Sequence, residues 1–65
     1  MYIEINNKEQ EETTLARLGN EGFLWVDDVY PEDWKLSLSD HFRGFPYDLK
    51  IINDSIRWSY NNTKN

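Results

Sequence analysis

The strongest constraint on this chain is that one small core must stabilise it without covalent cross-links. The chain has 65 residues, which is enough for one domain. It contains no Cys, so it can form neither a disulfide nor a thiolate metal site. Chains of this size bury only about 60% of their unfolded surface. Aromatic side chains are the main remaining resource, because there are three Trp, four Tyr and three Phe, and large rings bury roughly 150–250 Å² each. We expect these rings to serve both the core and an interface.

The charge is distributed unevenly along the sequence. Residues 1–33 hold nine Asp and Glu against two basic residues, a balance of −7, and residues 34–65 hold three Asp against five basic residues, a balance of +2, which together give −5. A small domain with one strongly acidic half suits a basic protein partner and repels nucleic-acid phosphate. We therefore expect a protein partner and no nucleic acid.

The sequence also carries expectations about location. No stretch approaches the roughly 18–20 apolar residues that a membrane span needs, and the first residues lack the basic and apolar regions of a signal peptide. The absence of Cys is typical of a reducing compartment. These features predict a soluble cytoplasmic protein with no membrane partner.

The first third of the chain predicts a strand followed by a helix. Residues 1–6 alternate between apolar and polar side chains, as in a half-buried strand. Asn6 or Asn7 offers an N-cap for a helix over residues 8–18, whose acidic side chains lie in its first half. Gly19 stands where a helix would end. The helix has a thin apolar stripe of Leu15, Leu18, Thr14 and the stem of Glu11, so it should cover one face of a sheet.

The middle of the chain is less regular. Residues 23–26 predict a second strand that is apolar on both faces, which favours a central position or a covering loop. Residues 27–34 predict an acidic loop containing Pro31. Residues 34–43 fit helical and strand spacing equally, and the Ser content favours an irregular segment with one helical turn.

The last third predicts a hairpin. Residues 47–52 and 55–60 read as strands joined by a turn at Asn53 and Asp54, and residues 61–65 read as a frayed polar tail. The chain is thus predicted to be one α+β domain over residues 1–60. Its single helix packs on a mostly antiparallel sheet of about four strands, in the order strand–helix–strand–strand–strand.

Three short motifs give a resemblance to a known group of proteins. They are Gly22-Phe23-Leu24-Trp25 after the helix, Phe45-Pro46-Tyr47, and Ile56-Arg57-Trp58-Ser59 in the hairpin. In this layout the chain resembles small uncharacterised proteins of bacteriophages and prophages, especially of Gram-positive hosts. The resemblance implies a phage accessory protein acting in the host cytoplasm, from a pool that includes inhibitors of host and defence proteins. It assigns no functional residue.

Neither catalysis nor metal binding is expected. Ser39-Asp40-His41 contains triad residue types, but a triad is assembled by the fold and not by sequence neighbours, so we expect an exposed polar turn. The acids of residues 27–33 do not follow the spacing of a calcium loop. We expect no enzyme activity, no metal and no cofactor.

The candidate partner-binding residues combine acids with aromatic side chains. Trp is enriched among interface hot spots, and Trp34 follows an acidic stretch, so it either contacts a partner or covers the core beneath the loop. Trp25 and Trp58 are predicted to be core residues. The full candidate set is Asp27, Asp28, Tyr30, Glu32, Asp33 and Trp34 in the loop, with Glu9 and Glu12 on the helix.

These observations predict a non-enzymatic, acidic protein-binding inhibitor that engages the basic surface of a host or anti-phage defence protein. Carboxylates would pair with a basic groove while the aromatic residues anchor the contact. Two alternatives remain open. One is an oligomeric module that sequesters a small ligand between subunits, since so small a core hardly encloses a ligand alone. The other is an immunity protein or antitoxin, which shares the same physics.

Overall fold

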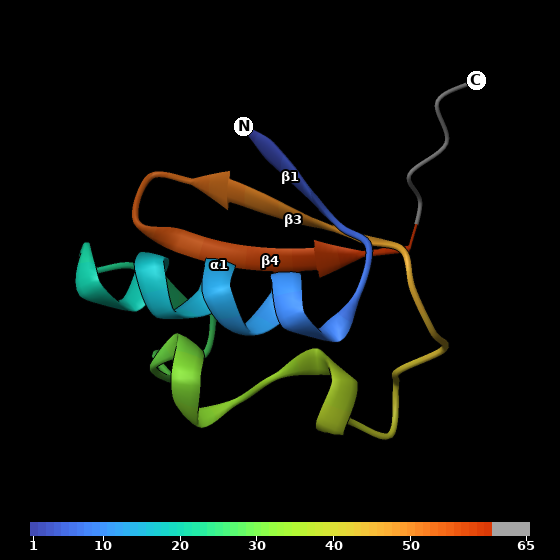
Figure 1. Cartoon of the computed structure of the whole chain (residues 1–65). Helices are drawn as coiled ribbons and strands as arrows, with labels where there is room; N and C mark the ends of the chain where they lie inside the picture. The colour runs from blue at the N-terminus through green and yellow to red at the C-terminus, as the bar shows by residue number, and fades with distance from the viewer. Residues whose placement is uncertain (61–65) are drawn as a thin grey trace.

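The computed structural model describes residues 1–60 (Figure 1). In chain order the elements are β1 (Tyr2–Ile5), α1 (Lys8–Asn20), β2 (Leu24–Trp25), two 3-10 turns η1 (Pro31–Asp33) and η2 (Leu36–Leu38), β3 (Tyr47–Ile52) and β4 (Ser55–Ser59). The predicted α+β class and the order strand–helix–strand–strand–strand are confirmed, as is the single helical turn within residues 34–43. The tail predicted for residues 61–65 lies outside the described residues.

The four strands form one mixed sheet in the order β1-β3-β4-β2. The β1–β3 and β3–β4 pairs are antiparallel, and β2 runs parallel to β4. A central place for β2 is therefore wrong, because this strand has only two residues and lies at the edge of the sheet. The alternative of a covering loop is right, since the buried Trp25 ring packs against Trp34.

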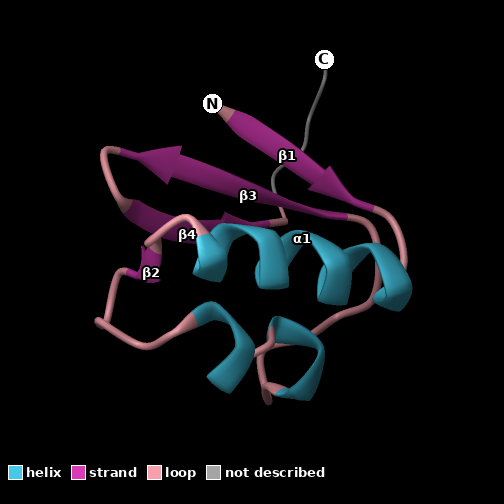
Figure 2. Cartoon of the chain, turned by 60° about the vertical axis from the view of Figure 1, so that its left-hand side comes forward, coloured by secondary structure: helices cyan, strands magenta, loops and turns pink. Residues whose placement is uncertain are grey.

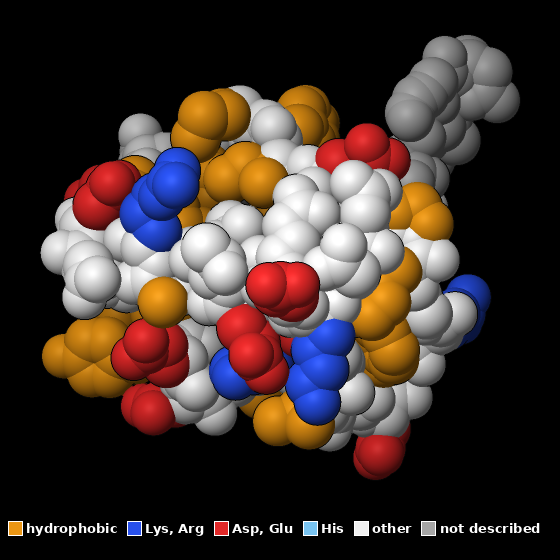
Figure 3. All heavy atoms as spheres, in the orientation of Figure 1, with side chains coloured by type: hydrophobic (Ala, Val, Ile, Leu, Met, Phe, Trp, Pro, Cys, Tyr) orange, Lys and Arg blue, Asp and Glu red, His pale blue; other side chains and the backbone are white. Residues whose placement is uncertain are grey.

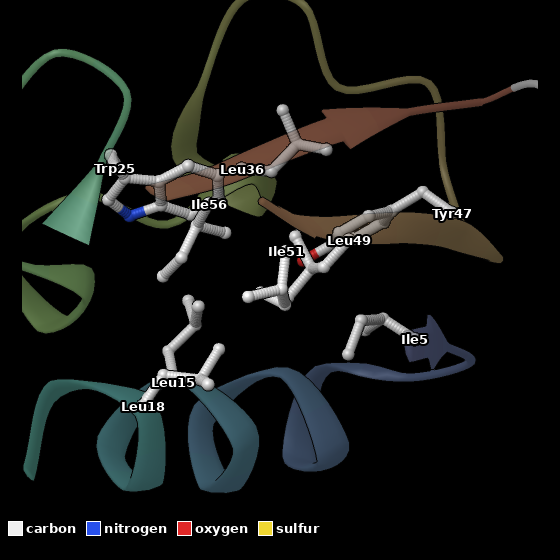
Figure 4. Close-up of a cluster of buried hydrophobic side chains, with 9 residues drawn as sticks. All are labelled: Ile5, Leu15, Leu18, Trp25, Leu36, Tyr47, Leu49, Ile51 and Ile56. Atoms are coloured by element: carbon white, nitrogen blue, oxygen red, sulfur yellow. The ribbon is translucent and has the colours of Figure 1, made fainter. Parts of the chain in front are cut away.

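One face of the sheet carries the core. Figure 4 shows Leu15 and Leu18 directed from α1 toward side chains of the strands, with Leu36 joining from η2. The alternating burial of β1, β3 and β4 fits a sheet with one covered face. The core cluster consists of Ile5, Leu15, Leu18, Trp25, Leu36, Tyr47, Leu49, Ile51 and Ile56.

The helix begins as predicted and ends later than predicted. The Asn7 side chain accepts a hydrogen bond from the Gln10 amide at 2.7 Å, which caps the first turn. At the other end, the Phe23 N–H donates to the Leu18 carbonyl, and the Gly22 N–H donates to that of Gly19. This is the Schellman pattern, with Gly22 at the left-handed position (φ +94°). Gly22 ends α1, so the assignment of that role to Gly19 was wrong.

Gly19 lies inside α1 and faces η1. A Cβ built at Gly19 would make ordinary van der Waals contact with the Pro31 ring, whose nearest atom would lie 3.6 Å away. Pro31 is buried. The acidic loop therefore lies against the helix with room for a methyl group at Gly19, and Figure 2 shows the two short turns beside α1.

A buried carboxylate joins α1 to the rest of the inner layer. Glu11 is 0% exposed. Its two oxygens accept hydrogen bonds from the Ser37 amide at 3.1 Å and from the Ser37 hydroxyl at 2.6 Å. The Tyr47 hydroxyl donates a third bond to the same carboxylate. The sequence placed only the stem of Glu11 in the apolar stripe, whereas the whole side chain is buried.

The same cluster perturbs the tyrosine. Burial raises the pKa of Tyr47, and the hydrogen bond to Glu11 and the negative charge of that carboxylate raise it further. Tyr47 therefore stays protonated in the folded protein at pH values where a free tyrosine ionises.

A side chain bonds the C-terminal end of the free β1 edge. The Gln10 amide nitrogen donates to the Glu4 carbonyl at 2.6 Å, and its oxygen accepts from the Asn6 N–H at 2.8 Å. At this point Gln10 provides the donor and acceptor that a further strand would offer. An exposed edge is a ready template for pairing with another chain, so this contact shortens that template.

The two glycines predict opposite effects on stability. Gly19→Ala should raise the free energy of unfolding by about 0.5–1 kcal/mol, because alanine favours the helix and the added Cβ makes ordinary contact with Pro31. Gly22→Ala should lower it by about 1 kcal/mol or more, because a Cβ is strained at φ +94°. Urea denaturation of both variants checks this. Equal destabilisation by the two changes would contradict the assigned helix end.

The raised pKa of Tyr47 predicts that the protein loses stability at alkaline pH. Tyr47→Phe should cost about 1–3 kcal/mol near pH 7, because Glu11 loses a buried donor. Above about pH 10, Tyr47 of the wild type ionises in the unfolded chain but stays protonated in the folded protein. The free energy of unfolding of the wild type should therefore fall by roughly 1.4 kcal/mol per pH unit, a loss that the variant does not share. The stability gap therefore narrows as pH rises, as urea denaturation between pH 8 and about pH 11 would measure.

Ser37→Ala is the matched control for this effect. It removes the Ser37 hydroxyl bond to Glu11 and keeps both the backbone N–H bond of residue 37 and the Tyr47 phenol, so it should retain the alkaline slope of the wild type. Parallel pH curves for the wild type and Tyr47→Phe would show that the phenol is not protected by the fold.

Candidate functional site

An open groove of about 790 Å³ lies where β2 ends beside β4. Three parts of the chain form it: the start of the loop after β2, the segment from Trp34 to the turn after η2, and the middle of β4. The lining residues are Trp25, Val26, Asp27, Val29, Trp34, Leu38, Ser39, Asp40, His41, Ile56, Arg57 and Trp58.

Three tryptophans give the groove its aromatic lining. The Trp25 and Trp34 rings meet edge to face with centroids 4.6 Å apart, and the Trp25 indole N–H donates to the Trp34 carbonyl at 2.9 Å. Trp58 packs against His41 with ring centroids 6.2 Å apart. These contacts orient the rings around the groove.

The predictions for the three rings have different outcomes. Trp25 is a core residue, as predicted, at 4% exposure. Trp58 is only half-buried and packs against the core while it lines the groove, so the core prediction is correct in part. Trp34 is also half-buried and covers Trp25. That contact bears out the core-covering alternative, and the partner contact of Trp34 stays a prediction.

A tight turn after β2 forms one wall. The Trp25 N–H donates to the Val29 carbonyl at 2.9 Å, and the Trp25 carbonyl accepts from the Asp28 N–H at 2.7 Å. Asp28 takes a left-handed conformation with φ 67°, which Asp tolerates better than most residues. The turn ends β2 and leaves Val26, at 49% exposure, on the rim of the groove.

The turn after η2 forms the opposite wall. Leu38 is 74% exposed, and the Ser39 hydroxyl accepts a hydrogen bond from the backbone N–H of His41 at 2.9 Å. The predicted polar turn at Ser39-Asp40-His41 is confirmed. The lining residues include two acids, Asp27 and Asp40, and one base, Arg57, so acids outnumber bases around the groove.

The structure brings only part of the predicted acidic site together. Asp27 and Trp34 line the groove, and the exposed Asp28 adjoins Asp27. Tyr30 is 64% exposed beyond this turn. Glu32 and Asp33 are exposed in η1, outside the groove lining.

The two helix acids lie on another part of the surface. Glu9 and Glu12 are exposed on α1, and Glu12 forms an ion pair with Lys35 at 3.5 Å. Figure 3 shows acidic side chains spread over the α1 side of the molecule with basic side chains between them. The helix acids are therefore separate from the groove lining, and Lys35 partly neutralises one of them.

Residues 1–60 contain no group of three or more His, Asp or Glu side chains placed to hold a metal ion. In the same range, no helix combines the length and the apolar character that crossing a membrane requires.

Several residues that line the groove were not predicted from the sequence as site residues. Val26 and Leu38 read as ordinary apolar residues, and Arg57 reads as the polar face of a strand. The signal that was available is that Leu38 stands among Ser37, Ser39 and Asp40, in a segment without a regular apolar face. An isolated leucine of this kind is a candidate for exposure.

Comparison of the chain with protein-family models, with curated proteins and with solved structures finds no match. The site is therefore interpreted from its own geometry.

Two residues that line the groove should differ in how much they contribute to stability. Leu38→Ser should change the free energy of unfolding by no more than about 0.5 kcal/mol, because Leu38 is largely exposed. Trp34→Ala should cost about 2 kcal/mol or more, because it uncovers Trp25. Thermal denaturation followed by circular dichroism measures both. A large loss from Leu38→Ser would show that this leucine supports the fold.

Proposed function

We propose that this protein is a non-enzymatic binding protein that inhibits another protein through its acidic, aromatic-flanked surface. The partner presents a basic surface. The observation that carries the proposal is that Asp27 and Trp34, one acidic and one aromatic residue of the loop after β2, line the same groove. A carboxylate beside a fixed ring offers both a charge contact and an apolar contact to a partner.

The apolar rim supports the same role. Val26 and Leu38 remain exposed on opposite walls of the groove, although burial of such side chains is worth roughly 1.5–3 kcal/mol each. Exposed apolar side chains gathered around a groove mark interaction sites more often than isolated ones do. Tyr30 and Asp28, exposed on the adjoining loop, extend this surface.

Electrostatics gives the proposed complex its kinetic character. The chain has a formal net charge of −5, which attracts a basic partner over a distance and raises the association rate. Contacts of the aromatic and apolar side chains then slow dissociation. The resemblance to phage accessory proteins makes the basic surface of a host or anti-phage defence protein the partner of choice, reached in the cytoplasm.

A small ligand is the second candidate, and the groove itself favours it. The site is formed within one chain, so a ligand module would not need the intersubunit pocket that the sequence analysis required. Binding of a small molecule without any protein partner, by a monomer in solution, would favour this alternative.

The test is salt-dependent capture from lysates of candidate bacterial hosts, with an acid-neutralised variant in parallel. The wild type should retain one stoichiometric basic protein at low salt and release it as salt rises, because exposed charge contacts are screened. The variant carries Asp27→Asn, Asp28→Asn, Glu32→Gln and Asp33→Asn, and its affinity for the captured protein should fall by at least about tenfold. Unchanged affinity would overturn the acidic-loop mechanism.

The matched control removes the same number of charges elsewhere. Glu4→Gln, Glu21→Gln, Asp48→Asn and Asp54→Asn neutralise four acids that neither line the groove nor belong to the loop after β2. This variant should keep most of the affinity, since contacts matter more than net charge at moderate salt. An equal loss in both variants would show that only the total charge counts.

A further inference from the structure

We propose that the groove binds an extended segment of the partner as an added strand on β4, with an apolar side chain of that segment in the groove and Lys or Arg on either side. The inference rests on the proposed function and specifies the form of its partner. It combines three observations: an open position on β4 at Trp58, an aromatic groove beside it, and an acidic lining.

The open position on β4 follows from the length of β2. The β2–β4 pairing joins Leu24 to Ser55 and Trp25 to Ile56 and then stops. Within residues 1–60, no strand therefore lies beside Trp58 on that side. The groove is lined by Val26 and Asp27 on one side and by Arg57 and Trp58 on the other, so it occupies the place where a longer β2 would continue.

The hydrogen-bonding groups on this edge belong to Trp58. The Leu24 N–H donates to the Asp54 carbonyl and the Val26 N–H donates to the Ile56 carbonyl, so alternate residues of β4 face β2. Backbone groups alternate sides along a strand, and the next residue in this series is Trp58. Its N–H and carbonyl therefore face the groove side and are available to a peptide backbone.

The outer strands are bonded in part within the chain. Gln10 bonds β1 at the Glu4 carbonyl and the Asn6 N–H. The turn after β2 bonds both backbone groups of Trp25. Open edges are a liability that proteins usually cover. Trp58 stands out because its open position borders an aromatic groove, which is the arrangement that strand addition uses.

The chemistry of the groove selects the segment. A strand added to β4 places alternate side chains on the inner face of the sheet, where Trp25, Trp34 and Leu38 line the groove. An apolar or aromatic residue fits there. Asp27 and Asp40 outnumber Arg57 among the charged lining groups, so neighbouring Lys or Arg residues complement the rim and acidic residues are repelled.

The experiment uses the whole protein and a defined probe. The probe is an acetylated and amidated peptide with a Val-Phe-Val centre and two Lys residues on each side. One control peptide has Glu in place of Lys, and two further peptides carry an N-methyl group on successive central residues. Amide resonances of isotope-labelled protein are followed during titration up to about 1 mM peptide, which detects weak complexes.

The expected result has three parts. The Lys peptide shifts the Trp58 amide and the Trp34 indole resonances, the Glu peptide binds at least about tenfold more weakly, and one of the two N-methyl peptides loses about tenfold while the other binds like the parent. N-methylation removes one N–H and keeps the side chain, so only a strand pairing with alternate contacts gives this difference.

Each other outcome overturns the inference in a recognisable way. Equal binding of both N-methyl peptides, with the same groove shifts, would replace strand addition by side-chain docking and leave the proposed function standing. Equal binding of the Glu peptide would remove the acidic selection. An absence of groove shifts with the Lys peptide would reject the strand site. The proposed acidic mechanism fails on a separate result, namely that the captured partner binds the acid-neutralised variant as tightly as the wild type.

Discussion

The arrangement of the inner layer depends on the buried carboxylate of Glu11. Burying an acid without partners is costly, and here the Ser37 amide, the Ser37 hydroxyl and the Tyr47 hydroxyl all donate to it. These bonds connect α1, η2 and β3 at one buried point. Residues 26–46 contain only two short 3-10 turns as regular structure. Glu11 therefore fixes the position of the segment that forms one wall of the groove.

The parts of the fold that could be predicted from sequence are the local ones. The alternation at Ile3 and Ile5, the Asn7 cap and the turn between β3 and β4 each depend on neighbours within a few residues. The helix end could not be decided in this way, because both Gly19 and Gly22 are chemically able to end a helix. The choice is visible only in the folded chain, where the Phe23 N–H bonds the Leu18 carbonyl around Gly22 and Gly19 stays inside α1 beside Pro31.

The candidate site was predictable only where composition reveals it. The acidic loop and Trp34 are visible in the sequence, and two of those residues, Asp27 and Trp34, do meet in the groove. The groove itself is not visible, because it exists where β2 stops pairing with β4 and where η2 leaves Leu38 exposed. The burial of the Glu11 carboxylate could not be predicted either, because it also depends on contacts between distant residues. In a Glu-rich helix, nothing local distinguishes the one carboxylate whose partners come from residues 37 and 47.

The ends of the strands show how local groups limit the sheet. Gln10 bonds the outer side of β1 at Glu4 and Asn6, and the turn after β2 bonds both backbone groups of Trp25. A longer β2–β4 pairing would require β2 to continue past Trp25. Instead the chain turns at Asp27 and Asp28, where Asp28 takes a left-handed conformation. This turn therefore leaves the groove open beside β4, and Asp27 adds a negative charge to a lining that also contains Asp40.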